Sequence, residues 1–289
     1  MPHLSLPPSS RRAFLQTAFG GVVFAMAPGG SEPWALLSDI HIPEDPATEN
    51  RGFHLHDNMK RVLEGVAQSP VRGMVISGDL ARTSGKPGDY RALRQFLEPT
   101  LSRMPVAMAL GNHDDRANFL EVFAEHPGAS AMVKGKHVLV IEAGPVRLIV
   151  LDSQIFVNRV PGLLGKAQRT WLDEYLRTSS NTPTLLFVHH NLEDNDGALL
   201  DSDRFLAVVR PHRKVKAVFY GHTHRYAMEQ QADGLHLINV PATAYTFDAA
   251  EPVGWLEAAF TGQGAELTLR AVGGNREKDG KTVAVRWRA

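Results

Sequence analysis

The sequence contains no cysteine among its 289 residues. This absence excludes disulfide frameworks, thiolate zinc sites and cysteine nucleophiles. It does not reveal the compartment, although a chain without thiols meets no oxidation problem in an oxidising one. A net charge is also absent, because 31 Lys and Arg residues balance 31 Asp and Glu residues. No broad basic field or acidic tail is present, so we expect no stable nucleic acid partner.

The N-terminus lacks an apolar run long enough to cross a bilayer, which takes roughly 20 residues. Residues 13–27 form a shorter run, interrupted by Gln16 and Thr17. The run follows Arg11-Arg12 and ends at Ala25-Met26-Ala27, which fits the small-x-small pattern of a cleavage site. This order is typical of a signal peptide. The stretch SRRAFL at residues 10–15 resembles the twin-arginine signal, which directs folded bacterial proteins through the membrane.

We therefore predict that residues 1–27 are a twin-arginine-type signal peptide, with the twin-arginine export machinery as a partner. The mature chain would then be periplasmic or extracellular in a bacterium and would not span the membrane. An uncleaved or lipid-tethered form is the alternative. After residue 32 the sequence shows no repeat, low-complexity tract or long linker, which predicts a single domain over residues 33–289.

Apolar patterning predicts the elements of this domain. Short apolar runs bounded by Gly, Pro, Asn or Asp indicate buried strands at 34–37, 74–77, 106–110, 137–141, 146–151, 184–188, 215–220 and 235–240. Helical spacing indicates helices at 59–67, 89–101, 167–176 and 202–209. The alternation of strands and helices implies a mostly parallel sheet flanked by helices. Alternating patterns at 255–260, 265–272 and 282–287 suggest an antiparallel set that closes a second sheet.

Side chains that bind metals follow five of the predicted strands. They are Asp39 and His41; Asp79; Asn112, His113 and Asp114; His189 and His190; and His222 and His224. Ligands in open α/β sheets bind at the carboxyl ends of strands, so these five strand ends can converge on one crevice. Glycines 78, 111 and 221 stand directly before three of the clusters and permit close backbone approach.

The spacing and chemistry of these residues favour a metal site. Residues i and i+2 of an extended backbone point the same way, so we expect the Asp39–His41 and His222–His224 pairs each to reach one centre. Carboxylate, imidazole and amide oxygen without sulfur suit Mn, Fe or Zn. Each cluster alone has an ordinary interpretation, such as a turn or a buried polar pair. Their joint order at strand ends argues against those interpretations.

The order of the clusters resembles that of the calcineurin-like metallophosphoesterases, whose blocks read D-x-H, G-D, G-N-H-D/E, H and G-H-x-H. The resemblance runs from about Trp34 to Tyr245. The stretches at residues 77–80, 111–116 and 151–153 are similar to the cyclic-nucleotide and glycerophosphodiester phosphodiesterase branch. The resemblance implies an α/β fold, a four-layer α-β-β-α sandwich in which helices flank two mixed sheets, with a dimetal site at one sheet edge.

The resemblance also implies a role for each residue. One metal would be held by Asp39, His41 and His224, the second by Asn112, His189 and His222, and Asp79 would bridge both. His113 would face the substrate phosphate or protonate the leaving oxygen, and Asp114 would orient His113. The family pattern favours His189 over His190 as the ligand. The cofactors would be two divalent ions, Mn, Fe or Zn, with a mixed Fe/Mn pair as one form.

The expected activity is hydrolysis of a small-molecule phosphate ester by a hydroxide that bridges the two metals, with phosphodiesters ahead of monoesters. The alternatives are a phosphomonoesterase or nuclease on the same scaffold, or a metal-binding scaffold without turnover. Two departures from relatives stand out. Arg82 occupies the position where purple acid phosphatases carry a tyrosine, so an iron-tyrosinate site is not expected. Asn191-Leu192 replaces the Pro-Pro of many relatives.

Overall fold

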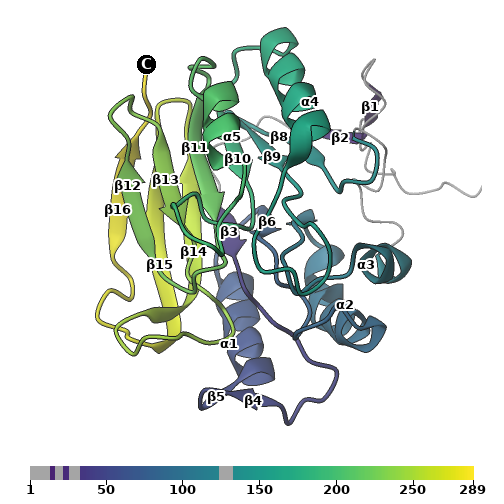
Figure 1. The fold of residues 1–289 in the computed structure, drawn as a ribbon. Helices are drawn as coiled ribbons and strands as arrows, with labels where there is room; N and C mark the ends of the chain where they lie inside the picture. Colours follow the sequence, from purple (N-terminus) through teal and green to yellow (C-terminus); the bar gives the residue numbers. More distant parts are fainter. Residues whose placement is uncertain (1–13, 17–21, 26–32, 124–132) are drawn as a thin grey trace, which may run out of the picture.

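The computed structural model describes residues 14–16, 22–25, 33–123 and 133–289, in which two large sheets pack face to face (Figure 1). The first sheet has eight strands in the order β1 (Phe14–Gln16), β2 (Val22–Ala25), β8 (Leu139–Ala143), β9 (Val146–Val150), β10 (Thr184–Phe187), β11 (Val215–Tyr220), β13 (His236–Asn239) and β12 (Ala227–Gln230). The second has six strands in the order β16 (Thr282–Arg286), β15 (Gly264–Gly274), β14 (Pro252–Phe260), β3 (Trp34–Leu37), β6 (Gly73–Ile76) and β7 (Val106–Met108). A small hairpin joins β4 (Glu49–Asn50) to β5 (Phe53–His54).

Both large sheets are mixed, as the resemblance implied. Strands β3, β6 and β7 are parallel neighbours in the second sheet, and β9, β10, β11 and β13 are parallel neighbours in the first. The C-terminal strands β14, β15 and β16 pair antiparallel, and β14 joins them to β3. The predicted antiparallel set is confirmed, and it completes the second sheet through the pairing of β14 with β3.

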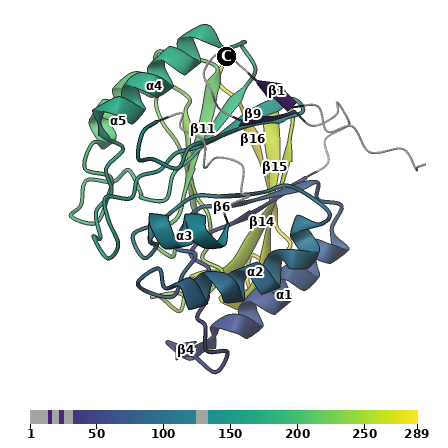
Figure 2. The same cartoon turned by 90° about the vertical axis from the view of Figure 1, so that its right-hand side faces the viewer.

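Helices cover the outer face of each sheet and complete four layers. Helices α1 (Leu55–Gln68) and α2 (Pro87–Leu101) pack on the six-stranded sheet, and α4 (Gly165–Thr178) and α5 (Ser202–Val209) on the eight-stranded sheet. Figure 2 shows the two pairs on opposite sides of the strands. Three apolar layers result, one between the sheets and one under each helical layer. The expected sandwich is therefore confirmed. None of the helices in the described part of the chain is both long and apolar enough to cross a membrane.

Helix α1 illustrates why these sequences form these elements. It buries Met59, Val62 and Val66, which recur at helical spacing and face the six-stranded sheet. Pro87 stands in the first turn of α2, where its missing N–H costs no hydrogen bond.

Some element boundaries differ from the sequence-based predictions. The strand predicted at 137–141 begins at Leu139, because the His137 N–H donates to the Asp152 carboxylate instead of a strand neighbour. The prediction for residues 1–27 falls mostly outside the described residues. Within it, β1 and β2 pair with each other, and β2 pairs parallel with β8. Export of the chain stays a prediction.

Candidate metal centre

The candidate metal ligands gather where the carboxyl ends of strands from both sheets meet. Asp39 follows β3, Asp79 follows β6 and Asn112 follows β7 in the six-stranded sheet. His189 follows β10, and His222 and His224 follow β11 in the eight-stranded sheet. Three of these segments follow strands of the six-stranded sheet and two follow strands of the eight-stranded sheet, so the candidate centre spans the junction between the two sheets.

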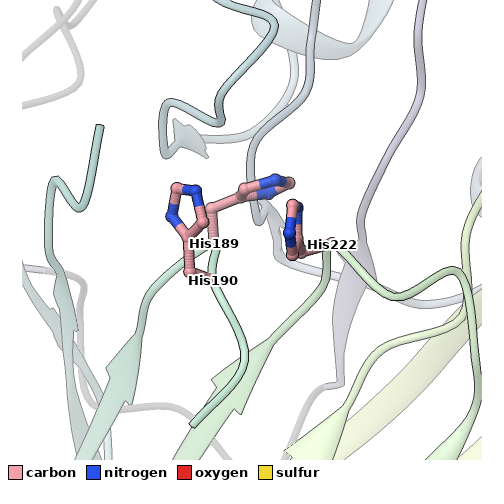
Figure 3. A group of neighbouring side chains, drawn as sticks. All are labelled: His189, His190 and His222. Carbon is pink, nitrogen blue, oxygen red and sulfur yellow. The ribbon is translucent and has the colours of Figure 1, made fainter. Parts of the chain in front are cut away.

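Among the described residues, three groups of side chains place their ligand atoms within 4.8 Å of one another. They are Asp39, His41 and His224; Asp39, Asp79 and His189; and His189, His190 and His222, shown in Figure 3. Asp79 lies between the first and third groups, since its Oδ2 is 3.7 Å from His41 Nε2 and 3.4 Å from His189 Nε2. The His189 Nε2 is also 3.3 Å from the Asn112 Oδ1. The predicted residues therefore form one continuous cluster.

Backbone carbonyls orient three of the imidazoles. The Nδ1 of His41 lies 3.1 Å from the Arg82 carbonyl, that of His189 lies 2.8 Å from the Ser77 carbonyl, and that of His224 lies 2.7 Å from the Tyr245 carbonyl. A carbonyl only accepts, so each Nδ1 carries a proton, and each ring in its neutral form presents a lone pair at Nε2. This is the arrangement that metal-ligating histidines show in proteins.

The two Nε2 atoms of His41 and His224 are 3.2 Å apart. Burial lowers the pKa of His41 to about 4, so its ring is neutral near pH 7. Two lone pairs that face each other at this distance repel, and a cation that accepts both removes the repulsion. The donor set of imidazole, carboxylate and amide oxygen therefore fits a divalent metal pair.

His190 differs from its neighbours because the protein engages both of its ring nitrogens. Its Nε2 lies 3.0 Å from the Val160 carbonyl and donates to it, and its Nδ1 accepts from the Ser153 hydroxyl at 2.7 Å. Burial, together with His189 and His222, lowers the pKa of His190 well below its ordinary value. His190 has no lone pair left for a metal, and the geometry favours His189.

The Asp79 carboxylate is stabilised as an anion. Burial alone would raise the pKa of Asp79, but His189 outweighs this effect and holds it well below the ordinary range. Burial alone would lower the pKa of His189, but the Asp79 carboxylate outweighs this effect and raises it to about 9. Asp39 accepts from the Ser38 hydroxyl at 2.6 Å and from the His222 N–H at 3.0 Å.

The local backbone at the cluster is left-handed. Positive φ angles occur at Asp39 (50°), His41 (41°), Asp79 (50°), His222 (70°) and His224 (55°). The expectation of an extended backbone at Asp39–His41 and His222–His224 was wrong, because the chain turns sharply where each strand ends. The expected close approach at glycines is confirmed, since a Cβ on Gly111 would overlap the Asp79 carboxylate and one on Gly221 would overlap Ser38.

Asp114 does not occupy the position expected of a residue that orients His113. Its carboxylate accepts from the backbone N–H groups of Gly111, Leu80 and Ala81 and from the Tyr90 hydroxyl. Burial, followed by the charge of Asp79, raises the pKa of Asp114 to about 6. Asp114 thus ties the loop after β7 to the loop after β6, and the orienting role assigned to it was wrong.

Asn158 and a backbone carbonyl hold the His113 ring instead. The His113 Nδ1 lies 2.8 Å from the Thr83 carbonyl and 3.2 Å from the Asn158 Oδ1. The Asn158 N–H donates to the Asn112 carbonyl at 2.6 Å, and its backbone is left-handed with φ 61°. Sequence reasoning missed Asn158 because it lies in a loop without a motif.

Two arginines that can contact phosphate differ in availability. Arg116 forms an ion pair with the buried Asp152 at 2.7 Å, which occupies its guanidinium. Arg82 is half-buried, and its Nε has no hydrogen-bond partner among the described residues. The buried His56 of α1 is held in a similar way to Arg116, since its Nε2 lies 2.7 Å from the Pro43 carbonyl.

Comparison with known proteins identifies the scaffold. The sequence profile of the calcineurin-like phosphoesterases matches residues 33–226, which include every block of the cluster. The chain belongs to the calcineurin-like phosphoesterase family. This phosphoesterase is 33% identical over 229 residues to a Synechococcus protein named "Probable cyclic nucleotide phosphodiesterase", covering 76% of this chain and 84% of the other.

Two further similarities concern a second relative and the fold. The phosphoesterase is 29% identical to a cyclic AMP phosphodiesterase of Haemophilus influenzae over 80% of this chain and 86% of that protein. A dimetal phosphatase structure from Danio rerio superimposes with a TM-score of 0.69 at 16% identity, over 90% of this chain and all of that one. That likeness concerns the fold alone.

Proposed function

We propose that this phosphoesterase hydrolyses small-molecule phosphodiesters with two divalent metal ions. The observation that carries the proposal is the orientation of three imidazoles: the Nε2 atoms of His41 and His189 face the anionic Asp79, and the Nε2 of His224 faces Asp39 at 3.5 Å. The names of the relatives support diesters over monoesters.

The candidate ligands divide into two sets that share one carboxylate. Asp39, His41 and His224 would hold one ion, Asn112, His189 and His222 the other, and Asp79 would contact both. When bound, the ions would supply Lewis-acid stabilisation of the phosphoryl oxygens and lower the pKa of water. The ions would be Mn, Fe or Zn, as the donor set indicates.

His113 supplies the proton chemistry in this proposal. Its Nδ1 donates to the Thr83 carbonyl, so the Nε2 is the atom that can hold or release a second proton. The ring lies 5.3 Å from that of His41, beside the cluster and only partly buried. From this position His113 can donate a proton to the leaving alkoxide of a diester.

The proposal includes export. Residues 1–27 would direct the folded chain through the twin-arginine machinery to the periplasm or beyond. Metal binding is coupled to folding, so a chain exported folded can load its metals in the cytoplasm.

Turnover of paired substrates tests the proposal. The full chain is stripped with a chelator, reloaded with Mn²⁺ and given an aryl phosphodiester or the matching monoester. We expect diester hydrolysis that appears only with metal. A preference for the monoester would overturn the diester assignment. Two bound metals without turnover of either substrate would indicate a scaffold without catalysis.

A further inference from the structure

Phe247 is a large apolar residue that stays exposed beside the candidate centre. It exposes 57% of its surface, although its ring centroid lies only 4.7 Å from that of His224 and 5.6 Å from that of Tyr245. Tyr245 in turn lies 5.1 Å from the His41 ring. A row of rings therefore leads from the candidate ligands outward to an open aromatic face.

Arg51 lies over this ring. Its guanidinium carbon is 4.6 Å from the centroid of Phe247. Arg51 stands at the tip of the β4–β5 hairpin, where Asn50 pairs with Phe53 and leaves Arg51-Gly52 as a two-residue turn. No carboxylate pairs with Arg51 among the residues that the structure describes. An uncompensated cation and an exposed ring thus share one place beside the metal-binding cluster.

The backbone of Arg51 adds a second observation. Its φ of 52° is left-handed, which Asn and Gly adopt more readily than Arg. In the described chain the other left-handed residues besides glycine are Asp39, His41, Asp79, Asn158, His222 and His224. These six are candidate ligands or, for Asn158, a contact of His113. Left-handed non-glycine residues often cluster at functional sites, and Arg51 belongs to this set.

The chemistry of the pair selects a class of ligand. An aromatic ring and a guanidinium both stack on planar bases, and the guanidinium also attracts phosphate. A glycerol headgroup has no planar face and gains nothing from Phe247. A nucleotide whose phosphate lies at the cluster carries its base across one sugar, and Phe247 lies one side chain beyond His224.

We propose that Phe247 and Arg51 form a subsite for the base of a nucleoside phosphodiester, so that nucleotides, and not glycerol diesters, are the substrate class. This rests on the proposed function for the position of the phosphate. The pair determines specificity and takes no part in bond breaking.

Ligand binding tests the subsite without requiring turnover. Calorimetry of the Mn²⁺-loaded full chain compares adenosine monophosphate with glycerol phosphate. Phe247→Ala should weaken binding of the nucleotide about tenfold, the effect of one lost stacking contact, and leave glycerol phosphate unchanged. Phe247→Trp should restore nucleotide binding, whereas Phe247→Leu should not. Arg51→Ala should weaken it several-fold. Val283→Ala, exposed at 44% on β16, is the control and should change neither ligand.

Two outcomes overturn the subsite: equal changes for both ligands in Phe247→Ala, or no change for either. Turnover of cyclic AMP and of a glycerophosphodiester by the same proteins separates the two proposals. Selective nucleotide binding without any turnover contradicts the proposed function and keeps the subsite. Turnover with a substrate preference that Phe247→Ala and Arg51→Ala leave unaltered keeps the function and contradicts the subsite.

Discussion

Asp79 is the carboxylate on which both halves of the cluster depend. Its oxygens lie near His41 and His189 and accept from the His113 N–H at 2.9 Å. Asp79→Asn should therefore abolish turnover and weaken both metals, because an amide has one acceptor oxygen where the carboxylate has two. Metal content after dialysis and diester hydrolysis measure the effect. Asp57→Asn, on a half-exposed side chain of α1, is the matched control. Retained activity in Asp79→Asn would contradict the bridging position.

The raised pKa of His189 leads us to predict opposite pH trends for stability and for metal affinity. Asp79 outweighs burial and raises the pKa of His189 from 6.5 to about 9. In the metal-free chain this stabilisation is complete below pH 6.5 and is lost as the pH rises through about 9. A metal ligand must be neutral, so Mn²⁺ affinity should rise over the same window. Thermal unfolding and calorimetry measure the two trends. His189→Gln should remove both pH trends. A Mn²⁺ affinity that does not change with pH would contradict the assignment of His189 as a ligand.

Asn158 should affect catalysis through the His113 ring. Removing its Oδ1 leaves the Nδ1–H of His113 with only the Thr83 carbonyl as an acceptor. If His113 protonates the leaving oxygen, Asn158→Ala should lower kcat about tenfold for a diester with an alkoxide leaving group. An aryl diester needs no proton and should react normally. Asn158→Asp keeps an acceptor and should restore the alkoxide diester. Equal losses on both substrates would indicate a purely structural role for Asn158.

At the scale of elements, the turn after β7 requires a residue without a side chain at Gly111. A Cβ there would overlap the Asp79 carboxylate and backbone. Gly111→Ala should therefore displace Asp79 and lower the metal content while the secondary structure persists. Circular dichroism and metal analysis measure the two properties. Gly262→Ala is the control, because a Cβ at that position meets nothing within 4 Å. Unchanged metal content in Gly111→Ala would show that the turn can relax.

Periodicity in the sequence predicted several elements together with their bounds. The bounds of β3, β11 and α5 agree with the prediction, since a polar or glycine residue follows each apolar run directly. Helix α3 (Arg116–Val122) was not predicted, because it has seven residues and buries only Phe119. Strand β12 was not predicted either, since none of its four residues is buried. Strand β12 is positioned by its antiparallel pairing with β13.

The candidate site was predicted as a set of residues but not as a network of contacts. The order of the blocks identified the cluster that the structure brings together. The contacts of Asp114 depend on the loop after β6, which is more than 30 residues distant in sequence. The backbone carbonyls that orient the imidazoles could not be predicted from residue types, because every residue has a carbonyl.

For the molecule as a whole, metal binding should stabilise the fold. Free metal at about 100 times its dissociation constant contributes roughly 2.7 kcal/mol. For a chain of this size that corresponds to an increase in Tm of roughly 5–10 °C. Thermal unfolding with Mn²⁺ and with a chelator measures the difference. Equal Tm values would contradict a site formed only in the folded state. Asp79→Asn should show a much smaller increase.

The candidate ligands come from both sheets, three segments from the six-stranded sheet and two from the eight-stranded sheet. Any slip of one sheet along the other changes the spacing of the ligands at once, whereas each sheet keeps its own hydrogen bonds. On warming, catalytic activity should therefore be lost at a lower temperature than the circular dichroism signal of the strands and helices. Activity would therefore report on how the two sheets are packed against each other. Substitutions in the apolar layer between the sheets would lower activity in assays as if they were active-site substitutions.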